Sequence, residues 1–210
     1  MNAEPSYAVV HVVDDDESFR QALTRLLRTA GYEVRPYASA GAFLLERQAG
    51  ARGCLVLDMK MPGPSGLELQ EALLRQNEML PIIFLTGYGD IPRAVQALKA
   101  GAVDFLTKPV QRTALLAAVQ TALTRDVARR ATRDRVRESH TRLDSLTPRE
   151  REVLAHVTEG KPNKWIAAEL GTAERTVKAH RAQIMRKMGV SSVAELVHVT
   201  DELRFEEHRN

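Results

Sequence analysis

The stretch VVHVVDDD, residues 9–16, places a strand-forming run directly before three aspartates. Further apolar runs also deliver one polar side chain at their carboxyl end: Asp58 after residues 54–57, Thr86 after 82–85 and Lys108 after 103–106. The carboxyl ends of parallel strands meet at one edge of an open sheet. We therefore expect two carboxylate sites, a hydroxyl and an ammonium to gather at that edge.

The surrounding sequence alternates between strand-like and helix-like segments five times within the first 124 residues. Apolar residues recur at helical spacing within residues 19–30, and Gly31 is suited to end that helix. Further helical patterns cover residues 43–45, 67–74, 91–100 and 115–123. Repeated βα units with right-handed crossovers predict a parallel sheet covered by helices on both faces.

Residues 124–143 are highly charged and contain neither Gly nor Pro, which is typical of a linker. We favour a solvated helix that continues the preceding one, with flexible coil as the alternative. The capping box Thr147-Pro148-Arg149-Glu150 then starts a helical region. Asn163 is expected to cap a short helix at 164–170 and Thr172 a longer one at 173–188. Two helices joined at a glycine turn, the second of them basic, form a helix-turn-helix pattern.

Composition limits the classes of protein that remain. The 210 residues suggest one large or two small domains, and 44% of them are hydrophobic. No apolar stretch approaches the ~20 residues of a membrane span, and the first residues lack the pattern of a secretory signal. The single cysteine, Cys54, excludes an internal disulfide and favours a cytoplasmic location. The histidines show no ligand spacing with a cysteine, so we expect no zinc site.

Charge is distributed unevenly along the chain. Residues 1–124 hold 12 Lys and Arg against 13 Asp and Glu, whereas residues 125–210 hold 18 against 14. Within residues 173–188 there are five basic residues and one acidic residue. The two halves are therefore expected to have different partners.

The predicted cluster suits phosphoryl chemistry. Mg²⁺ binds through carboxylates and phosphate oxygens, which Asp14, Asp15 and Asp58 would complement. One carboxylate oxygen could attack a phosphoryl group, while Lys108 and Thr86 hold its oxygens. An aspartate run alone more often caps a helix or lies on a solvated loop. Four polar sites in this order at four strand ends favour the functional interpretation.

The motifs in the first half resemble the receiver domain of bacterial two-component response regulators. They are VVDDDE (12–17), LDMKMPG (57–63), LTGYGD (85–90) and GAVDFLTKP (101–109). The resemblance implies a flavodoxin-like (βα)5 domain at residues 7–123. It also implies that Asp58 is the phosphoacceptor and that Mg²⁺ (or Mn²⁺) is bound by Asp14, Asp15, Asp58 and the backbone carbonyl of Lys60. Asp15 is the expected direct ligand of the acidic pair.

The same resemblance makes Thr86 and Lys108 the phosphate-sensing pair and Phe105 the aromatic switch residue, and it implies a cis Lys108-Pro109 bond. The sequence departs from the family at Pro64, where Met or Leu is common, and at Phe105, which lacks the hydroxyl of the usual tyrosine. We hypothesise that Lys60 and Tyr88 flank the path of an attacking water and set the lifetime of the phosphoryl group.

The basic helix expected at residues 173–188 has two distinct faces. On a helical wheel Val177, Ile184 and Met188 share the face that should pack on the domain core. The opposite face carries Arg175, Ala179, Ala182 and Arg186, flanked by Lys178 and Gln183. Small alanines permit a close approach to base edges, and basic side chains contact phosphates or guanine. The alternative is an ordinary solvated basic face.

Three motifs make the region similar to LuxR-type four-helix DNA-binding domains: TPREREVL (147–154), NKWIA (163–167) and RTVKAHR (175–181). We place this all-α domain at residues 144–205 and the linker at 124–143. The expected DNA contacts are Arg175, Thr176, Lys178, Ala179, His180, Ala182, Gln183 and Arg186. Arg181 lies near the core face and is expected to be structural. Trp165 departs from the family, and it either contacts the DNA backbone, touches the receiver or lies on a partly buried face.

Together the two halves resemble FixJ/NarL-type regulators, and most closely the FixJ branch. This implies a cytoplasmic, DNA-binding transcription regulator and not an enzyme, phosphorylated on Asp58 by a sensor histidine kinase. We expect a homodimer on phosphorylation, operator half-sites ~34 Å apart, contact with RNA polymerase and positive promoter control, with no membrane partner. One rival is a haloacid-dehalogenase-like phosphatase with Asp14 as nucleophile. The other is a constitutive DNA-binding protein with a vestigial receiver.

Overall fold

The computed structural model describes residues 8–48, 50–78, 80–87 and 91–207. The chain forms two compact units, Met1–Arg129 and Arg130–Asn210. Within the described residues, no helix is both long and apolar enough to span a lipid bilayer.

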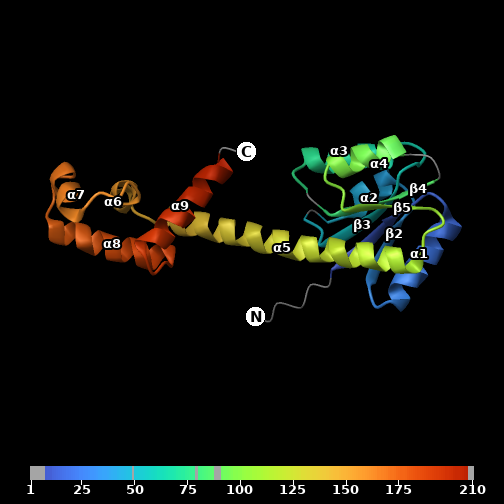
Figure 1. The fold of residues 1–210 in the computed structure, drawn as a ribbon, viewed down its shortest axis with the longest axis horizontal. Coiled ribbons are helices and arrows are strands. Elements are labelled where there is room, and N and C mark those ends of the chain that lie inside the picture. The colour runs from blue at the N-terminus through green and yellow to red at the C-terminus, as the bar shows by residue number, and fades with distance from the viewer. Residues whose placement is uncertain (1–7, 49, 79, 88–90, 208–210) are drawn as a thin grey trace. The chain divides into compact units, whose positions relative to one another are not determined.

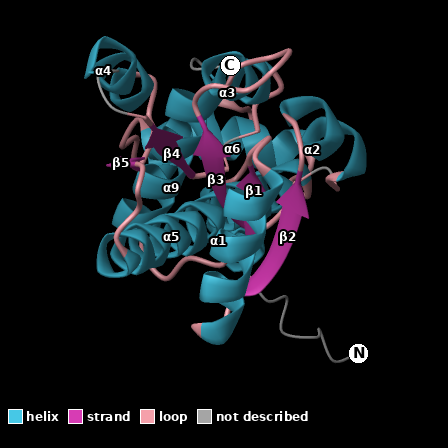
Figure 2. Cartoon of the chain, turned by 90° about the vertical axis from the view of Figure 1, so that its right-hand side faces the viewer, coloured by secondary structure: helices cyan, strands magenta, loops and turns pink. Residues whose placement is uncertain are grey.

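The first unit is built on a five-stranded parallel sheet with the order β2-β1-β3-β4-β5 (Figures 1 and 2). The strands are β1 (Val9–Val13), β2 (Glu33–Tyr37), β3 (Gly53–Asp58), β4 (Ile82–Thr86) and β5 (Asp104–Thr107). Pro36 lies in β2, an edge strand, where its missing N–H leaves no inner ladder position unpaired. The predicted parallel α/β sheet is confirmed.

Helices cover both faces of this sheet. They are α1 (Glu17–Thr29), α2 (Ala40–Glu46), α3 (Gly66–Arg75), α4 (Ile91–Lys99) and the first part of α5 (Arg112–Asp144). One core packs Phe43, Leu73 and Ala97 of α2, α3 and α4 against the sheet. The other packs Leu27 of α1 and Leu115 of α5 against the opposite face. Burial from both sides explains why the central strands are apolar throughout and do not alternate with polar residues.

Helix α5 runs without interruption through residues 124–143, so the predicted helix is confirmed and the coil alternative is wrong. One residue of this segment belongs firmly to the first unit. The buried carboxylate of Asp126 accepts a hydrogen bond from the backbone N–H of Gly53 at 3.0 Å. Gly53 has φ +114, and a Cβ there would lie 1.8 Å from the Val9 carbonyl oxygen. The start of the segment expected to be a linker therefore binds the first residue of the central strand β3.

The second unit contains the end of α5 followed by α6 (Pro148–Thr158), α7 (Asn163–Glu169), α8 (Glu174–Met188) and α9 (Val193–Glu207). The predicted capping box is present at Thr147 and Glu150. Helix α8 packs against α6 and α7 through a core that includes Val177, Ile184 and Met188. The two helices of the predicted helix-turn-helix are therefore α7 and α8.

Two predicted caps in this unit are wrong. Helix α7 already begins at Asn163, and α8 begins at Glu174 rather than at residue 173. The residues before them, Pro162 and Ala173, make no side-chain capping bond. The Asn163 amide oxygen instead accepts from Arg181 Nη1 at 3.0 Å, and the Thr172 N–H closes the end of α7 on the Ala167 carbonyl. A tertiary hydrogen bond therefore occupies the Asn163 side chain, and Thr172 belongs to the turn that ends α7.

Candidate functional site

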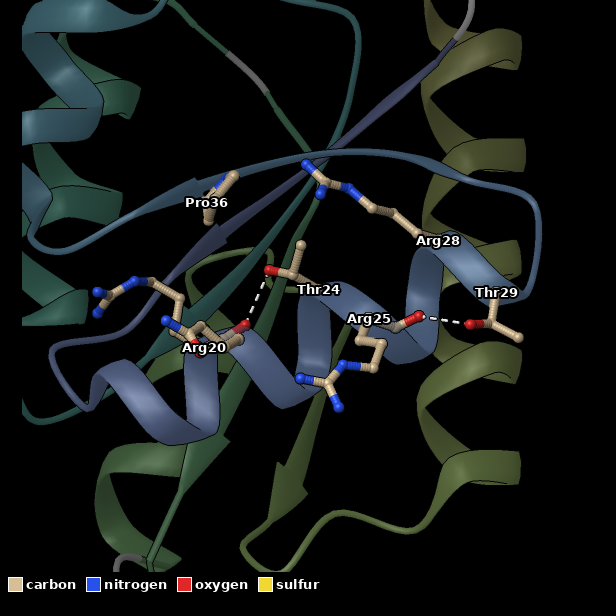
Figure 3. Close-up of a pocket in the computed structure, with 7 residues that line it drawn as sticks. Arg20, Thr24, Arg25, Arg28, Thr29 and Pro36 are labelled. Carbon is tan, nitrogen blue, oxygen red and sulfur yellow. Dashed lines mark hydrogen bonds between the residues drawn. The ribbon is translucent and has the colours of Figure 1, made fainter.

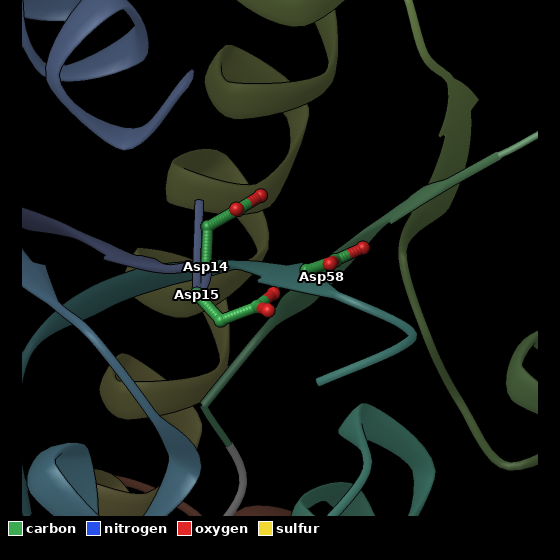
Figure 4. Close-up of side chains that lie close together, drawn as sticks. All are labelled: Asp14, Asp15 and Asp58. Carbon is green, nitrogen blue, oxygen red and sulfur yellow. The ribbon is translucent and has the colours of Figure 1, made fainter. Parts of the chain in front are cut away.

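An acidic pocket lies where β1 and β3 end side by side. Asp14 and Asp15 follow β1, and Asp58 is the last residue of β3. One carboxylate oxygen of each lies within 4.8 Å of one oxygen of each of the others (Figure 4). Asp14 is fully buried and Asp58 nearly so, whereas Asp15 is exposed. The structure therefore brings together all three carboxylates proposed from the sequence.

Lys108 reaches this pocket from the end of β5. Its Nζ lies 2.8 Å from Asp14 Oδ2 and 3.3 Å from Asp58 Oδ1. Its backbone N–H donates to the Thr86 carbonyl at 2.7 Å, and the Lys108-Pro109 peptide is cis, as predicted. Burial works to lower the pKa of Lys108, but the hydrogen bond to Asp14 and the charge of Asp58 outweigh it and raise the pKa above its usual value. The ammonium is therefore held charged between two carboxylates.

The ionised form of Asp58 is disfavoured in the pocket. Burial raises its pKa above the ordinary value, and the charge of Asp14 raises it further. The Lys108 charge and a hydrogen bond from the Lys60 backbone oppose this effect without cancelling it. Three carboxylates facing one ammonium leave an excess of two negative charges when all are ionised. A divalent cation would supply the missing charge, and oxygen ligands suit a hard cation.

The remaining predicted receiver residues lie around this edge. Thr86 ends β4, is 3% exposed and donates its hydroxyl to the Gly87 carbonyl at 3.2 Å. It directly follows Leu85, the residue that pairs with Asp58 across the sheet. Phe105 is half-buried on β5, and Lys60 is exposed two residues after Asp58. Tyr88 lies outside the described residues.

Several contacts around the pocket were not anticipated from the sequence. The Phe19 ring lies 4.5 Å from Lys108 Nζ, and Arg20 donates to the Asp14 backbone carbonyl at 2.6 Å. Asp16 behaves as the simpler interpretation of an aspartate run predicts, because its side chain caps α1 by accepting from the Phe19 N–H. A Cβ at Gly66 would lie 2.5 Å from the Asp58 carbonyl oxygen. Helical spacing placed Phe19 on the core face but gave no signal of its contact with an ammonium.

Helix α8 separates an apolar face from a polar face, as its sequence predicts. Val177, Ile184 and Met188 are buried. Of the eight proposed contact residues, Thr176 and His180 are half-buried, and six are exposed: Arg175, Lys178, Ala179, Ala182, Gln183 and Arg186. The exposed alanines leave backbone accessible between basic side chains, a surface that can approach a major groove closely. Arg181 is half-buried and bonded to Asn163, which accords with its predicted structural role.

Trp165 lies on α7 with 52% of its surface exposed. Lys161 Nζ stacks over its ring at 4.3 Å from the centroid, and that ammonium also pairs with Glu159 at 2.8 Å and Glu169 at 3.3 Å. The side chain is thus exposed, with the Lys161 ammonium over its ring, and it does not lie on the partly buried face of the third sequence-based alternative. The exposed half of the ring remains accessible to a partner.

Each of the two units matches a known protein family. Residues 10–120 match the response regulator receiver domain, and residues 144–200 match the luxR family of bacterial regulatory proteins. The chain is a response regulator. Its relatives include the response regulator protein TodT of Pseudomonas putida, 46% identical over 94% of this chain and 87% of TodT. The transcriptional regulatory protein FixJ of Azorhizobium caulinodans is 43% identical over 93% of this chain and 92% of FixJ.

Solved structures agree with this assignment. The response regulator StyR matches with a TM-score of 0.85 and 48% identity, covering 93% of this chain and 99% of that chain. Full-length FixJ from B. japonicum matches with a TM-score of 0.58 and 37% identity, covering 94% and 98%. This response regulator therefore combines a receiver with a LuxR-type DNA-binding domain, and its relatives regulate transcription. A phosphatase would leave residues 144–200 without a role.

Proposed function

We propose that Asp58 of this response regulator accepts a phosphoryl group from a sensor histidine kinase. The observation that carries the proposal is the convergence of Asp14, Asp15 and Asp58 with the Lys108 ammonium at one sheet edge. Mg²⁺ (or Mn²⁺) is proposed to bind these three carboxylates and the Lys60 backbone carbonyl. Bound there, the cation would offset the charge of the carboxylates and of the incoming phosphoryl oxygens.

In the transfer step, an Asp58 carboxylate oxygen forms a bond to phosphorus as the bond from phosphorus to the kinase histidine nitrogen breaks. Lys108 already lies 3.3 Å from Asp58 Oδ1, so its ammonium is placed to pair with a phosphoryl oxygen. The Thr86 hydroxyl, now bonded to the Gly87 carbonyl, turns to donate to a second phosphoryl oxygen. Lys108 stays paired with Asp14 during the transfer, because its contact with Asp14 at 2.8 Å is shorter than its contact with Asp58 at 3.3 Å.

The proposed output is a change in oligomeric state. Movement of Thr86 and repacking of Phe105 alter the surface of α4 and β5, where Val95 and Leu98 are exposed apolar residues of α4. A second copy of the chain covers this surface when Asp58 is phosphorylated. The phosphoryl group shifts this equilibrium only by its differential interaction with the two states. The dimer then places two α8 helices on operator half-sites.

On double-stranded promoter DNA, α8 is proposed to enter the major groove. Lys178, Ala179 and Ala182 face the base edges, Arg175 and Arg186 contact phosphates, and Thr176, His180 and Gln183 lie beside them. The regulator is proposed to act in the cytoplasm as an activator that contacts RNA polymerase. Arg175→Ala should weaken operator binding at all sequences and lower the salt dependence by about one phosphate contact.

The switch is tested with beryllofluoride, a mimic of the phosphoryl group, added with Mg²⁺ to the full chain. Mass and operator affinity should both increase for the wild type and for the control Asp134→Asn, whose residue is exposed on α5. Asp58→Asn should show neither change. Mass spectrometry after incubation with a phosphodonor should locate the phosphoryl group on Asp58. Phosphorylation of Asp14, or an unchanged mass and affinity with beryllofluoride, contradicts the proposal.

The proposed roles of Lys60 and Tyr88 have a separate test. The rate of autodephosphorylation is measured for Lys60→Ala and Tyr88→Ala after phosphorylation by a small-molecule donor. Both rates should differ from that of the wild type if these side chains flank the path of the attacking water. Equal rates in all three proteins would show that neither residue controls the lifetime.

A further inference from the structure

A second polar pocket lies along α1, outside the acidic cluster (Figure 3). It has a volume of about 490 Å³ and is lined by residues of α1 and by Pro36 of β2. Three of the lining residues are the arginines Arg20, Arg25 and Arg28, and none is acidic. The pocket is within the size range of small-molecule sites.

The positive charge of this pocket is not neutralised by neighbouring carboxylates. Within the part of the chain that the structure describes, none of the three arginines forms an ion pair. The only acidic residue of α1, Glu17, accepts a hydrogen bond from Gln21 at 3.0 Å and does not line the pocket. Glu33 on the adjoining strand β2 pairs with Arg35 instead. The three guanidinium groups around this hollow are therefore not paired with carboxylates of the described residues.

Two of these arginines are held in place rather than free in solvent. Arg20 Nη1 donates to the Asp14 carbonyl at 2.6 Å, and Arg28 Nη2 donates to the Val34 carbonyl at 3.1 Å. Both acceptors are neutral, so these bonds orient the guanidinium groups without cancelling their charge. Each guanidinium has five N–H donors and uses one of them in these bonds.

The spacing of the arginines sets the size of the ligand. Residues 20, 24 and 28 share one face of the helix, so Arg20 and Arg28 bracket Thr24 with their Cα atoms ~12 Å apart. Thr24 is buried, and its hydroxyl donates to the Arg20 carbonyl at 2.8 Å. Guanidinium forks match phosphate oxygens, and one phosphate is too small to engage both ends of this span.

We propose that this pocket binds a small anion that carries two or more phosphate groups. Arg28 and Arg25 hold one end of the anion, and Arg20 holds the other. The Arg20 guanidinium also donates to the backbone carbonyl of Asp14. Arg20 therefore connects the bound anion to a residue of the acidic pocket. This site is independent of whether Asp58 is phosphorylated.

The test uses calorimetry of the full chain with tripolyphosphate, without divalent cations because the probe chelates them. Since α8 also attracts anions, the starting protein carries Arg175→Gln and Arg186→Gln. This protein should bind one tripolyphosphate per chain, at least about tenfold more tightly than orthophosphate. Adding Arg25→Gln and Arg28→Gln should weaken binding at least about tenfold, since two charge-assisted hydrogen-bond donors are lost. Adding Arg75→Gln on α3, the matched control, should leave affinity unchanged.

Three outcomes overturn the proposal: no binding by the starting protein, equal affinity after Arg25→Gln and Arg28→Gln, or equal loss with Arg75→Gln. A further arm replaces the probe with an acidic peptide. Peptide binding that depends on Arg25 and Arg28, without tripolyphosphate binding, would assign the pocket to a protein partner and also overturn it. Tyrosine circular dichroism confirms that each variant retains the folded receiver.

Discussion

Replacing Lys108 by methionine should destabilise the receiver in a way that depends on pH and on divalent cations. The change keeps the length of the side chain and removes the ammonium that contacts Asp14 at 2.8 Å and Asp58 at 3.3 Å. Removing one partner of a buried ion pair typically costs about 3–5 kcal/mol. A quarter of the Lys108 side chain is exposed, so solvent screening reduces the expected loss to about 2 kcal/mol.

The pH dependence of this loss follows from the two pKa shifts. The raised pKa of Lys108 means that its contribution is fully present at and below neutral pH. The raised pKa of Asp58 means that stability falls as pH rises through the folded pKa, because the ionised form is disfavoured in the fold. Without Lys108 the total fall is larger, because the ionised Asp58 loses its counter-charge. The variant should therefore lose more stability at neutral pH than in acid, and saturating Mg²⁺ should restore most of the loss of about 2 kcal/mol.

The chain offers a separate spectroscopic signal from each unit for this measurement. All four tyrosines lie in the first 124 residues, whereas the single tryptophan is Trp165. Urea unfolding followed by tyrosine circular dichroism should show the loss, and Trp165 fluorescence should be unchanged. Lys99→Met, at an exposed position of α4, is the matched control. A loss of equal size at both pH values and insensitive to Mg²⁺ would refute the electrostatic reasoning.

Three further predictions concern stability. Burial of His11 and the charge of Arg35 lower the pKa of His11 from 6.5 to about 4. The neutral imidazole therefore contributes about 3 kcal/mol to folding stability above pH 6.5, and this contribution is lost as pH falls towards 4. In acid titrations of stability, His11→Phe should remove this pH-dependent loss. Gly53→Ala should cost more than about 2 kcal/mol or prevent folding because its Cβ meets a backbone oxygen, whereas Gly101→Ala, with open space, should cost about 1 kcal/mol in urea unfolding. Glu150→Ala removes half of a capping box and the bond to Lys187, so the Trp165-reported stability should fall by about 1 kcal/mol while the tyrosine signal is unchanged.

The acidic pocket was predictable because its residues occupy positions fixed by topology. A parallel sheet puts every strand end on the same edge, so Asp14, Asp58 and Thr86 had to lie there once the strands were assigned. The contact of Phe19 with Lys108 was not predictable in this way, since it joins residues 89 positions apart through side-chain direction. The same holds for the bond from Arg20 to the Asp14 carbonyl.

The predicted linker shows a different limit of sequence patterns. Its high charge correctly indicated a largely solvated helix, and its lack of Gly and Pro correctly indicated continuity. The composition of a segment, however, does not show which single residue is buried. It therefore did not predict that Asp126 is buried and accepts from the Gly53 amide. The Asn163 cap was wrong for a related reason. Local propensity favours Asn before a helix, but a distant arginine bonded its side chain instead.

The charge balance of the acidic pocket predicts the order in which the cation binds and the phosphoryl group is transferred. Asp14, Asp15 and Asp58 carry three negative charges against the single positive charge of Lys108, so an anionic phosphodonor is repelled by an excess of two. A divalent cation brings this excess to zero. Transfer then converts the Asp58 carboxylate to an acyl phosphate with a charge of about −2, so the site changes by only about one unit. Cation binding should therefore precede phosphoryl transfer, and Asp15→Asn, which removes the exposed negative charge, should weaken Mg²⁺ binding while easing donor approach in its absence.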